Sequence, residues 1–230
     1  MQITLITPTA DQPNGVVLLE KYMSTQTEKF HQWIVADDGI EHASLTMGQT
    51  HLVRPRQHEG AQSLASNILA ALPHVSGDIV IIVEHDDYYA KDHISVCLDR
   101  LEHVKATGSK WQRYYNVYYR THRTMKNIGS ALCNTAFRAE LIPHVERAAQ
   151  KAFSRNAIGL DRFFWDSLAG MAVETHDINT VVGIKGLPGR KGLGIGHKPP
   201  DGRSTPDPDL NQLRAWIGDD AESYAQYGRV

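Results

Sequence analysis

An apolar tetrapeptide, IVII at residues 79–82, is the feature that most constrains this chain, because acidic residues follow it almost at once. A strand of large apolar residues is normally buried on both faces, as in a parallel sheet covered by helices. This strand continues into VEHDDYY, where Glu84, Asp86 and Asp87 stand close together with His85 among them. Clustered carboxylates raise one another's pKa and destabilise a fold unless a cation neutralises them. The sequence therefore raises the question of whether a metal ion lies at the end of this strand.

The first half of the chain alternates short apolar segments with segments of helical periodicity. The predicted strands are residues 3–7, 32–38, 51–55 and 78–84. The predicted helices are residues 15–26 and 60–75. Strands separated by helices of this length indicate an α/β fold with a mostly parallel central sheet and right-handed crossovers.

Polar residues follow three of these predicted strands. They are Thr7, Pro8 and Thr9 after the first, Asp37 and Asp38 after the second, and the acidic cluster after the fourth. Ligands of open α/β sheets bind at the carboxyl ends of the strands, so these groups converge if the strands are neighbours. A single aspartate at such a place is also common in turns and helix caps. Three acids together favour Mg²⁺ or Mn²⁺, which take oxygen ligands and often share them with phosphates.

The second half is less regular. The spacing predicts helices over 93–108 and 157–170, a strand in the aromatic and basic segment 110–126, and a strand or turn over 129–142 that ends at Pro143. A glycine-rich stretch spans 182–200, and a short amphipathic segment follows over 210–227. Leu213, Trp216 and Ile217 of that segment would pack on the domain or meet a partner.

Size and charge exclude several classes of protein. The 230 residues suit one domain, and a net charge of −2 gives no global field that favours nucleic acid or an anionic membrane. The two cysteines, Cys97 and Cys133, indicate no disulfide framework. The first residues are interpreted as a strand rather than a signal peptide, and no apolar run approaches the ~20 residues of a membrane helix. The expected location is the cytoplasm.

The order of the motifs resembles glycosyltransferases of the GT-A fold, most closely the inverting family 2 enzymes. The corresponding segments are STQTEKFHQWIVADDG at 24–39, HEGAQSLASNILAALPHVSGDIVIIVEHDD at 58–87, YYAKDHI at 88–94, GSALCNTAFRAELI at 129–142 and LDRFFWDSL at 160–168. The sequence departs from the family pattern at Glu84, where the first Asp of D-x-D is usual, at Ile40, where DDGS has Ser, and at Leu160, where Glu often precedes the base.

This resemblance implies a metal-dependent enzyme that moves a sugar from a nucleotide-sugar, most commonly a UDP-sugar, to a hydroxyl group with inversion. It implies that Thr7 and Asp38 contact the base and ribose, with Asp37 beside them. Asp86 and Asp87 would bind Mn²⁺ or Mg²⁺ and the ribose or diphosphate. Asp161 would be the general base on the acceptor, and Asp166 is a neighbouring candidate.

The same resemblance implies a single GT-A domain over 1–198, with a nucleotide-sugar half at 1–100 and an acceptor half with a glycine-rich lid at 101–198. Residues 199–230 would form a Pro-rich linker and a short helix. The lid would place Lys185, Arg190 and Lys191 on the diphosphate and His197 on the metal, with His176 behind it. A flexible surface loop is the other interpretation of the glycines.

The segment 110–126 leaves the acceptor open, because its basic groups are interleaved with aromatic ones. Such a pattern binds polyanions, stacks on sugars, or forms a strand with buried aromatics. An acceptor in nucleic acid, such as a hydroxylated pyrimidine in DNA, is therefore an alternative to a glycan or small molecule. A nucleotidyltransferase and a non-catalytic nucleotide-sugar-binding protein are the competing functions on this fold.

Overall fold

The computed structural model describes residues 1–127 and 129–228, so the last two residues of the predicted C-terminal segment lie outside the described part. Its larger sheet contains β1 (Ile3–Thr9), β2 (Gln32–Asp37), β3 (Thr50–Val53), β4 (Ile79–Ile82), β6 (Ala106–Ser109), β9 (Ala136–Arg138) and β10 (Val173–His176). The strand order is β10-β6-β9-β4-β1-β2-β3. The strands from β4 to β3 are parallel, whereas β9 is antiparallel to β4 and β6. The predicted mostly parallel central sheet is confirmed, and β4, β1 and β2 are neighbours.

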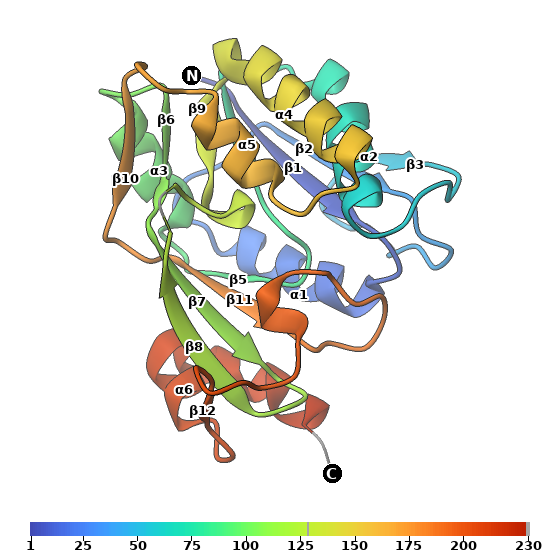
Figure 1. Cartoon of the computed structure of the whole chain (residues 1–230), viewed down its shortest axis with the longest axis vertical. Helices are drawn as coiled ribbons and strands as arrows, with labels where there is room; N and C mark the ends of the chain where they lie inside the picture. The colour runs from blue at the N-terminus through green and yellow to red at the C-terminus, as the bar shows by residue number, and fades with distance from the viewer. Residues whose placement is uncertain (128, 229–230) are drawn as a thin grey trace.

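Helices cover both faces of this sheet, which explains why its central strands are apolar throughout. The helices are α1 (Pro13–Ser24), α2 (Gly60–Ala71), α3 (His93–Leu101), α4 (Ile142–Arg155), α5 (Leu160–Asp166) and α6 (Asn211–Ile217). Consecutive residues of β1 point to opposite sides: Leu5 packs in the core that contains Leu19 of α1, and Ile6 packs in the core that contains Ile68 of α2. In Figure 1, α2, α4 and α5 lie together on one side of the sheet.

A second sheet, which the sequence did not predict, extends the fold. It contains β5 (Tyr88–Tyr89), β7 (Trp111–Asn116), β8 (Thr121–Lys126), β11 (Val181–Lys185) and β12 (Thr205–Pro206). The strand order is β12-β8-β7-β11-β5, and β7 and β8 form an antiparallel hairpin. The predicted single strand over 110–126 is therefore two strands. The start of the predicted glycine-rich loop is strand β11 rather than loop.

Two other predictions about local structure were wrong, and a third was incomplete. The helix predicted over 93–108 ends at Leu101, because Ala106–Ser109 is fully buried and pairs with β9 and β10. Pro143 lies in the first turn of helix α4, which begins at Ile142, rather than ending a segment, since the first turn needs no backbone N–H from proline. The short C-terminal helix expected in the amphipathic segment 210–227 is present as α6, and a 3₁₀ helix over Gly218–Tyr227, which was not predicted, follows it.

The C-terminal segment packs on the rest of the chain. Leu213 and Ile217 of α6 are buried in the core that contains α1, and the hydroxyl oxygens of Tyr22 and Tyr224 lie 2.7 Å apart. Among the described residues, none of the helices is both long enough and apolar enough to span a bilayer.

Candidate functional site

A cavity of about 400 Å³ opens at the carboxyl ends of β1 and β4. It brings together residues that are far apart in sequence, from the start of the chain, the acidic cluster, helix α5 and the glycine-rich segment. Of the residues predicted to form the site, those that line it are Pro8, Thr9, Glu84, Asp86, Asp87, Asp161, Lys185, Arg190, Lys191 and His197.

The ammonium group of Lys185 neutralises the acidic cluster. Its Nζ lies 2.9 Å from Asp86 Oδ2 and 2.6 Å from Asp87 Oδ1, and all three side chains are at most 10% exposed. Lys185 is the last residue of β11, so pairing of that strand with β7 fixes where the ammonium lies. One cation at the end of β4 is thus the protein's own lysine. The sequence had instead predicted that Lys185 belongs to a glycine-rich lid over the diphosphate.

The lysine does not fully offset the charge of the carboxylates. Burial, and next the charge of Asp87, raise the pKa of Glu84 to about 8. Burial also raises the pKa of Asp87 to about 7, although Lys185 opposes this. Burial opposes ionisation of Asp86 too, but the nearby charge of Lys185 outweighs it and holds the pKa of Asp86 below its usual range. The site therefore retains room for additional positive charge.

Several ligand atoms face one another in this cluster. Asp87 Oδ2 is buried and has no hydrogen-bond partner, which is unusual for a carboxylate oxygen. His197 Nε2 lies 3.5 Å from Asp86 Oδ2. Ligand atoms of Glu84, Asp87 and Cys133 all lie within 4.8 Å of one another. Burial, followed by the charge of Lys185, lowers the pKa of His197 to about 4, so its imidazole is neutral at pH 7 and free to act as a ligand.

Helix α5 carries both acids that the sequence offered as the base. Asp161, in the first turn, lines the cavity, and burial raises the pKa of its carboxyl. Its Oδ1 accepts a hydrogen bond from the backbone N–H of Arg162 at 2.8 Å. Asp166 is 62% exposed at the side chain and lies 3.6 Å from the guanidinium of Arg162. Only the first of these two acids is therefore placed on the cavity.

The residues predicted to bind the nucleoside are divided between the cavity and the core. Thr7 is fully buried, and its hydroxyl accepts a hydrogen bond from Trp33 Nε1. Thr9 lines the cavity with a buried hydroxyl that lacks a partner. Asp38 Oδ1 accepts hydrogen bonds at 2.9 Å from Ser63 and from Asn67, which do line the cavity.

Asp37 and His176 lie elsewhere than the sequence suggested. Neither belongs to the wall of the cavity. Asp37 turns toward His42 and His51, and His176 is at the end of β10.

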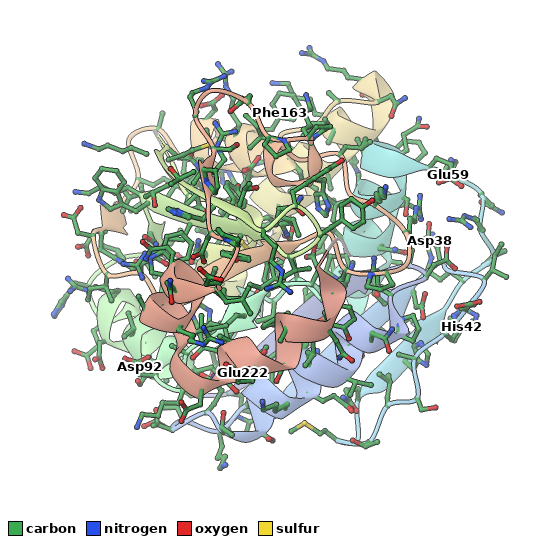
Figure 2. The ribbon with its side chains drawn as sticks, turned by 90° about the horizontal axis from the view of Figure 1, so that it is seen from below. Asp38, His42, Glu59, Asp92, Phe163 and Glu222 are labelled. Carbon is green, nitrogen blue, oxygen red and sulfur yellow. The ribbon has the colours of Figure 1, made fainter. Side chains whose placement is uncertain are left out.

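The glycine-rich segment folds over the cavity and docks on the loop that follows β1. Gly189 has φ of +116°, and a Cβ there would collide with the carbonyl oxygen of Asp11. The next residue, Arg190, donates its backbone N–H to the same oxygen at 3.1 Å. The Arg190 guanidinium lies 2.6 Å from Glu59 and 3.6 Å from Asp38, two residues that Figure 2 labels on the same side of the molecule. Lys191 lines the cavity and is exposed.

Most basic groups of the segment 110–126 contact other parts of the same chain. Lys110 pairs with Asp177 at 2.7 Å, and Arg123 lies 3.5 Å from Asp201. Three more are held by aromatic rings or carbonyls: Arg113 over Trp216, Lys126 over Trp111, and Arg120 against Pro208 and Ala225. This arrangement favours a structural role for the segment over a polyanion-binding surface.

Residues of the cavity wall that sequence reasoning missed include Ser63, Asn67, Tyr114 and Cys133. Asn67 lies in the segment that matched the family pattern, and it joins the ends of β1 and β2 by donating to Thr9 O and Asp38 Oδ1. Tyr114 and Cys133 also lie in segments that had been singled out, but nothing local indicated that they face the acids.

The comparisons with known proteins concern the family and the fold of this chain. The sequence profile described as "Glycosyl transferase family 2" matches residues 18–165. A search of curated proteins found no match.

Solved structures match over most of this chain at low sequence identity. TarS of S. aureus has a TM-score of 0.52 at 14% identity over 81% of this chain and 37% of its own. The mannosyltransferase PcManGT from Pyrobaculum calidifontis, in complex with GDP-Man and Mn²⁺, has a TM-score of 0.50 at 14% identity over 81% of this chain and 57% of its own. The 2-C-methyl-D-erythritol 4-phosphate cytidylyltransferase from Thermus thermophilus has a TM-score of 0.50 at 12% identity over 78% of this chain and 91% of its own. At these identities the likeness concerns the fold.

Proposed function

The chain belongs to glycosyl transferase family 2, and from this premise we propose that it is a metal-dependent, inverting glycosyltransferase that uses a nucleotide-sugar donor. The observation that carries the proposal is the shared cavity. Asp161 lines the same cavity as the acidic cluster and Lys185, so an acid suited to be a base shares the cavity with groups suited to bind a diphosphate. The proposed halves are 1–100 for the donor and 101–198 for the acceptor and the lid.

The acidic cluster fits a divalent cation. Asp87 offers a buried oxygen without a partner, and His197 offers a neutral nitrogen beside Asp86. Carboxylate oxygens with one imidazole suit Mn²⁺ or Mg²⁺, which commonly bind through few protein ligands together with substrate phosphates. Asp86, Asp87 and His197 would hold the ion, which when bound would stabilise the negative charge that develops on the leaving diphosphate.

The protein's own cations would assist the leaving group. Lys185 is buried next to the proposed metal ligands, and Lys191 and Arg190 come from the segment that covers the cavity. Fixed positive charges in a site removed from water stabilise developing negative charge more strongly than they would in water. Pro8 and Thr9 would contact the nucleoside, and the free hydroxyl of Thr9 is available to hydrogen-bond it.

Asp161 would act as the general base. The acceptor oxygen forms the new bond to the anomeric carbon, the bond from that carbon to the diphosphate oxygen breaks, and the hydroxyl proton passes to the Asp161 carboxylate. A raised pKa brings this carboxyl closer to the working pH, which is favourable for proton transfer. A single base and one displacement give inversion without a covalent intermediate.

The donor is proposed to be a UDP-sugar. This rests on the family resemblance, and two of the structural relatives were solved with UDP-GlcNAc and with GDP-Man. The chain spans 37% of the TarS chain described above and 62% of the shorter TarS chain solved with UDP-GlcNAc, so the activity of the whole TarS protein is not assigned to it. Nucleotidyltransferases share the fold, but the loop after β1 contains TADQP rather than the Gly-rich, Arg-containing loop that those enzymes usually have there.

A thermal-shift screen of nucleotide-sugars with and without Mn²⁺ tests the proposal, because a ligand that binds the native state raises the unfolding temperature. We expect a UDP-sugar to raise it, and Mn²⁺ to increase the shift. Stabilisation by nucleoside triphosphates but by none of the nucleotide-sugars would instead favour a nucleotidyltransferase.

A further inference from the structure

A second group of metal-ligating side chains lies outside the cavity. Asp37 Oδ2 is 2.9 Å from His42 Nδ1 and 3.4 Å from His51 Nε2. The three ligand atoms all lie within 4.8 Å of one another. None of these residues lines the cavity, and the proposed transferase chemistry uses none of them.

The fold brings the three residues together through the pairing of two strands. Asp37 is the last residue of β2, and His51 is in β3, where it pairs with Val35 of β2. His42 comes from the loop that connects these strands, and Figure 2 shows it at the periphery of the molecule. The loop therefore folds back so that its imidazole meets the carboxylate that precedes it.

The carboxylate of Asp37 is oriented for this role. Its Oδ1 accepts the backbone N–H of Gly39 at 2.8 Å, which leaves Oδ2 directed at the two imidazoles. Among the ion pairs of the described residues, Asp37 has no lysine or arginine partner. The Asp37 side chain is 2% exposed, whereas His42 is 34% and His51 is 25% exposed, so the group is closed on the protein side and open to water on the other.

We propose that Asp37, His42 and His51 form a zinc site. Two imidazoles and one carboxylate are a ligand set that Zn²⁺ takes with water in the fourth position, and imidazole nitrogen favours Zn²⁺ over Mn²⁺ or Mg²⁺. One ionised carboxylate and two neutral imidazoles offset half of the charge of the ion. Bound zinc would link the loop 38–49, through His42, to β2 and β3. This site is separate from the metal proposed for the diphosphate.

Co²⁺ substitution tests the site without reference to activity, because Co²⁺ occupies zinc sites and absorbs visible light most strongly when it is four-coordinate. The chelator-stripped full chain is titrated with Co²⁺ and then with Zn²⁺. The variants are His42→Gln and His51→Gln, with exposed His74→Gln as the matched histidine control and Asp87→Asn to remove a ligand of the other proposed site. Far-UV circular dichroism in chelator shows whether each variant is folded.

We expect one equivalent of Co²⁺ to produce four-coordinate bands that Zn²⁺ abolishes, with the bands kept in His74→Gln and Asp87→Asn. In His42→Gln and His51→Gln, the affinity for Co²⁺ is expected to fall at least ~10-fold. Even the loss of a residue that only hydrogen-bonds to a metal ligand lowers metal affinity by that much. Zn²⁺ should raise the unfolding temperature of the parent chain but not of these two variants. The proposal is overturned if the parent chain binds no Co²⁺, if both histidine variants bind it equally well, or if only Asp87→Asn loses the bands. In those cases the imidazoles merely donate hydrogen bonds to Asp37, or the metal lies elsewhere.

Discussion

Replacement of Lys185 by methionine is the sharpest perturbation of the acidic cluster. The change keeps an unbranched chain of similar length and removes the charge that lies 2.9 Å from Asp86 and 2.6 Å from Asp87. Removing one partner of a buried ion pair costs about 3–5 kcal/mol, because the other charge is left buried and unpaired. In a chain of this size, 1 kcal/mol shifts the unfolding temperature by about 2–4 °C. We therefore expect Lys185→Met to lower it by about 10 °C in chelator at pH 7.5.

Mn²⁺ should restore much of this loss. In the variant, the metal would supply the positive charge that the carboxylates lack, and saturation at 100 times the dissociation constant stabilises by about 2.7 kcal/mol. In the parent chain Lys185 already occupies the space between Asp86 and Asp87, so the stabilisation by Mn²⁺ should be smaller. The assay is thermal unfolding of both proteins across a Mn²⁺ titration.

Lys105→Met is the matched control. Lys105 pairs with Glu140 at 2.8 Å, a distance like those at Lys185, but its side chain is 49% exposed. Exposed pairs contribute about 0–1 kcal/mol, so this variant should unfold within a few degrees of the parent and respond to Mn²⁺ as the parent does. The reasoning is refuted if Lys185→Met is no less stable than Lys105→Met, or if Mn²⁺ stabilises the variant no more than the parent.

Three further predictions concern the proposed base, the core and the glycine-rich segment. Asp161→Asn should lower the rate of sugar transfer by about 10²–10⁴-fold. In the parent, kcat/KM should fall on the acid side at a pH above the ordinary aspartate range, because burial raises the pKa of Asp161. A parent pH profile that stays flat down to pH 4 would contradict the assignment of Asp161 as the base. Burial lowers the pKa of His93 to about 3, so its imidazole stays neutral in the folded chain at pH 4. The unfolded chain binds a proton at this residue below pH 6.5, so the free energy of unfolding should fall between pH 6.5 and pH 4. The loss from this group is about 3 kcal/mol, and denaturant titrations of the parent and His93→Gln should converge as pH falls. Gly189→Ala places a side chain at a left-handed backbone position, where it collides with Asp11. The KM for the donor should therefore rise several-fold, while the thermal shift caused by the metal persists. An unchanged KM would show that docking of the glycine-rich segment does not assist donor binding.

The convergence of strand ends was predictable from the sequence. The alternation of apolar strands with helices required parallel neighbours, and the adjacent order β4-β1-β2 brings Thr9, Asp38 and the acidic cluster to one edge of the sheet. The apolar character of IVII was informative for the same reason, because helices cover both faces of β4. Local periodicity and the order of the motifs contained this information.

The charge balance of the site was not predictable in the same way. Lys185 reaches Asp86 and Asp87 from about one hundred positions later in the chain, through a second sheet whose β5 has only two residues. Such pairings depend on tertiary contacts rather than on local propensity. The same holds for the strand at 106–109, which lies where the sequence predicted the end of a helix. The side chains of Asp37 and Thr7 also turned away from the cavity, because His42, His51 and Trp33 supply partners that only the folded chain brings close.

The central claim is that the acidic cluster and Asp161 together transfer a sugar from a nucleotide-sugar. Release of nucleoside diphosphate from a panel of UDP- and GDP-sugars, with and without Mn²⁺, measures this most directly, because many transferases hydrolyse their donor slowly when no acceptor is present. We expect Mn²⁺-dependent release from at least one UDP-sugar by the parent chain, and none by a folded Asp87→Ala variant. A parent chain that binds and cleaves no nucleotide-sugar, or an Asp87→Ala variant as active as the parent, would contradict the claim.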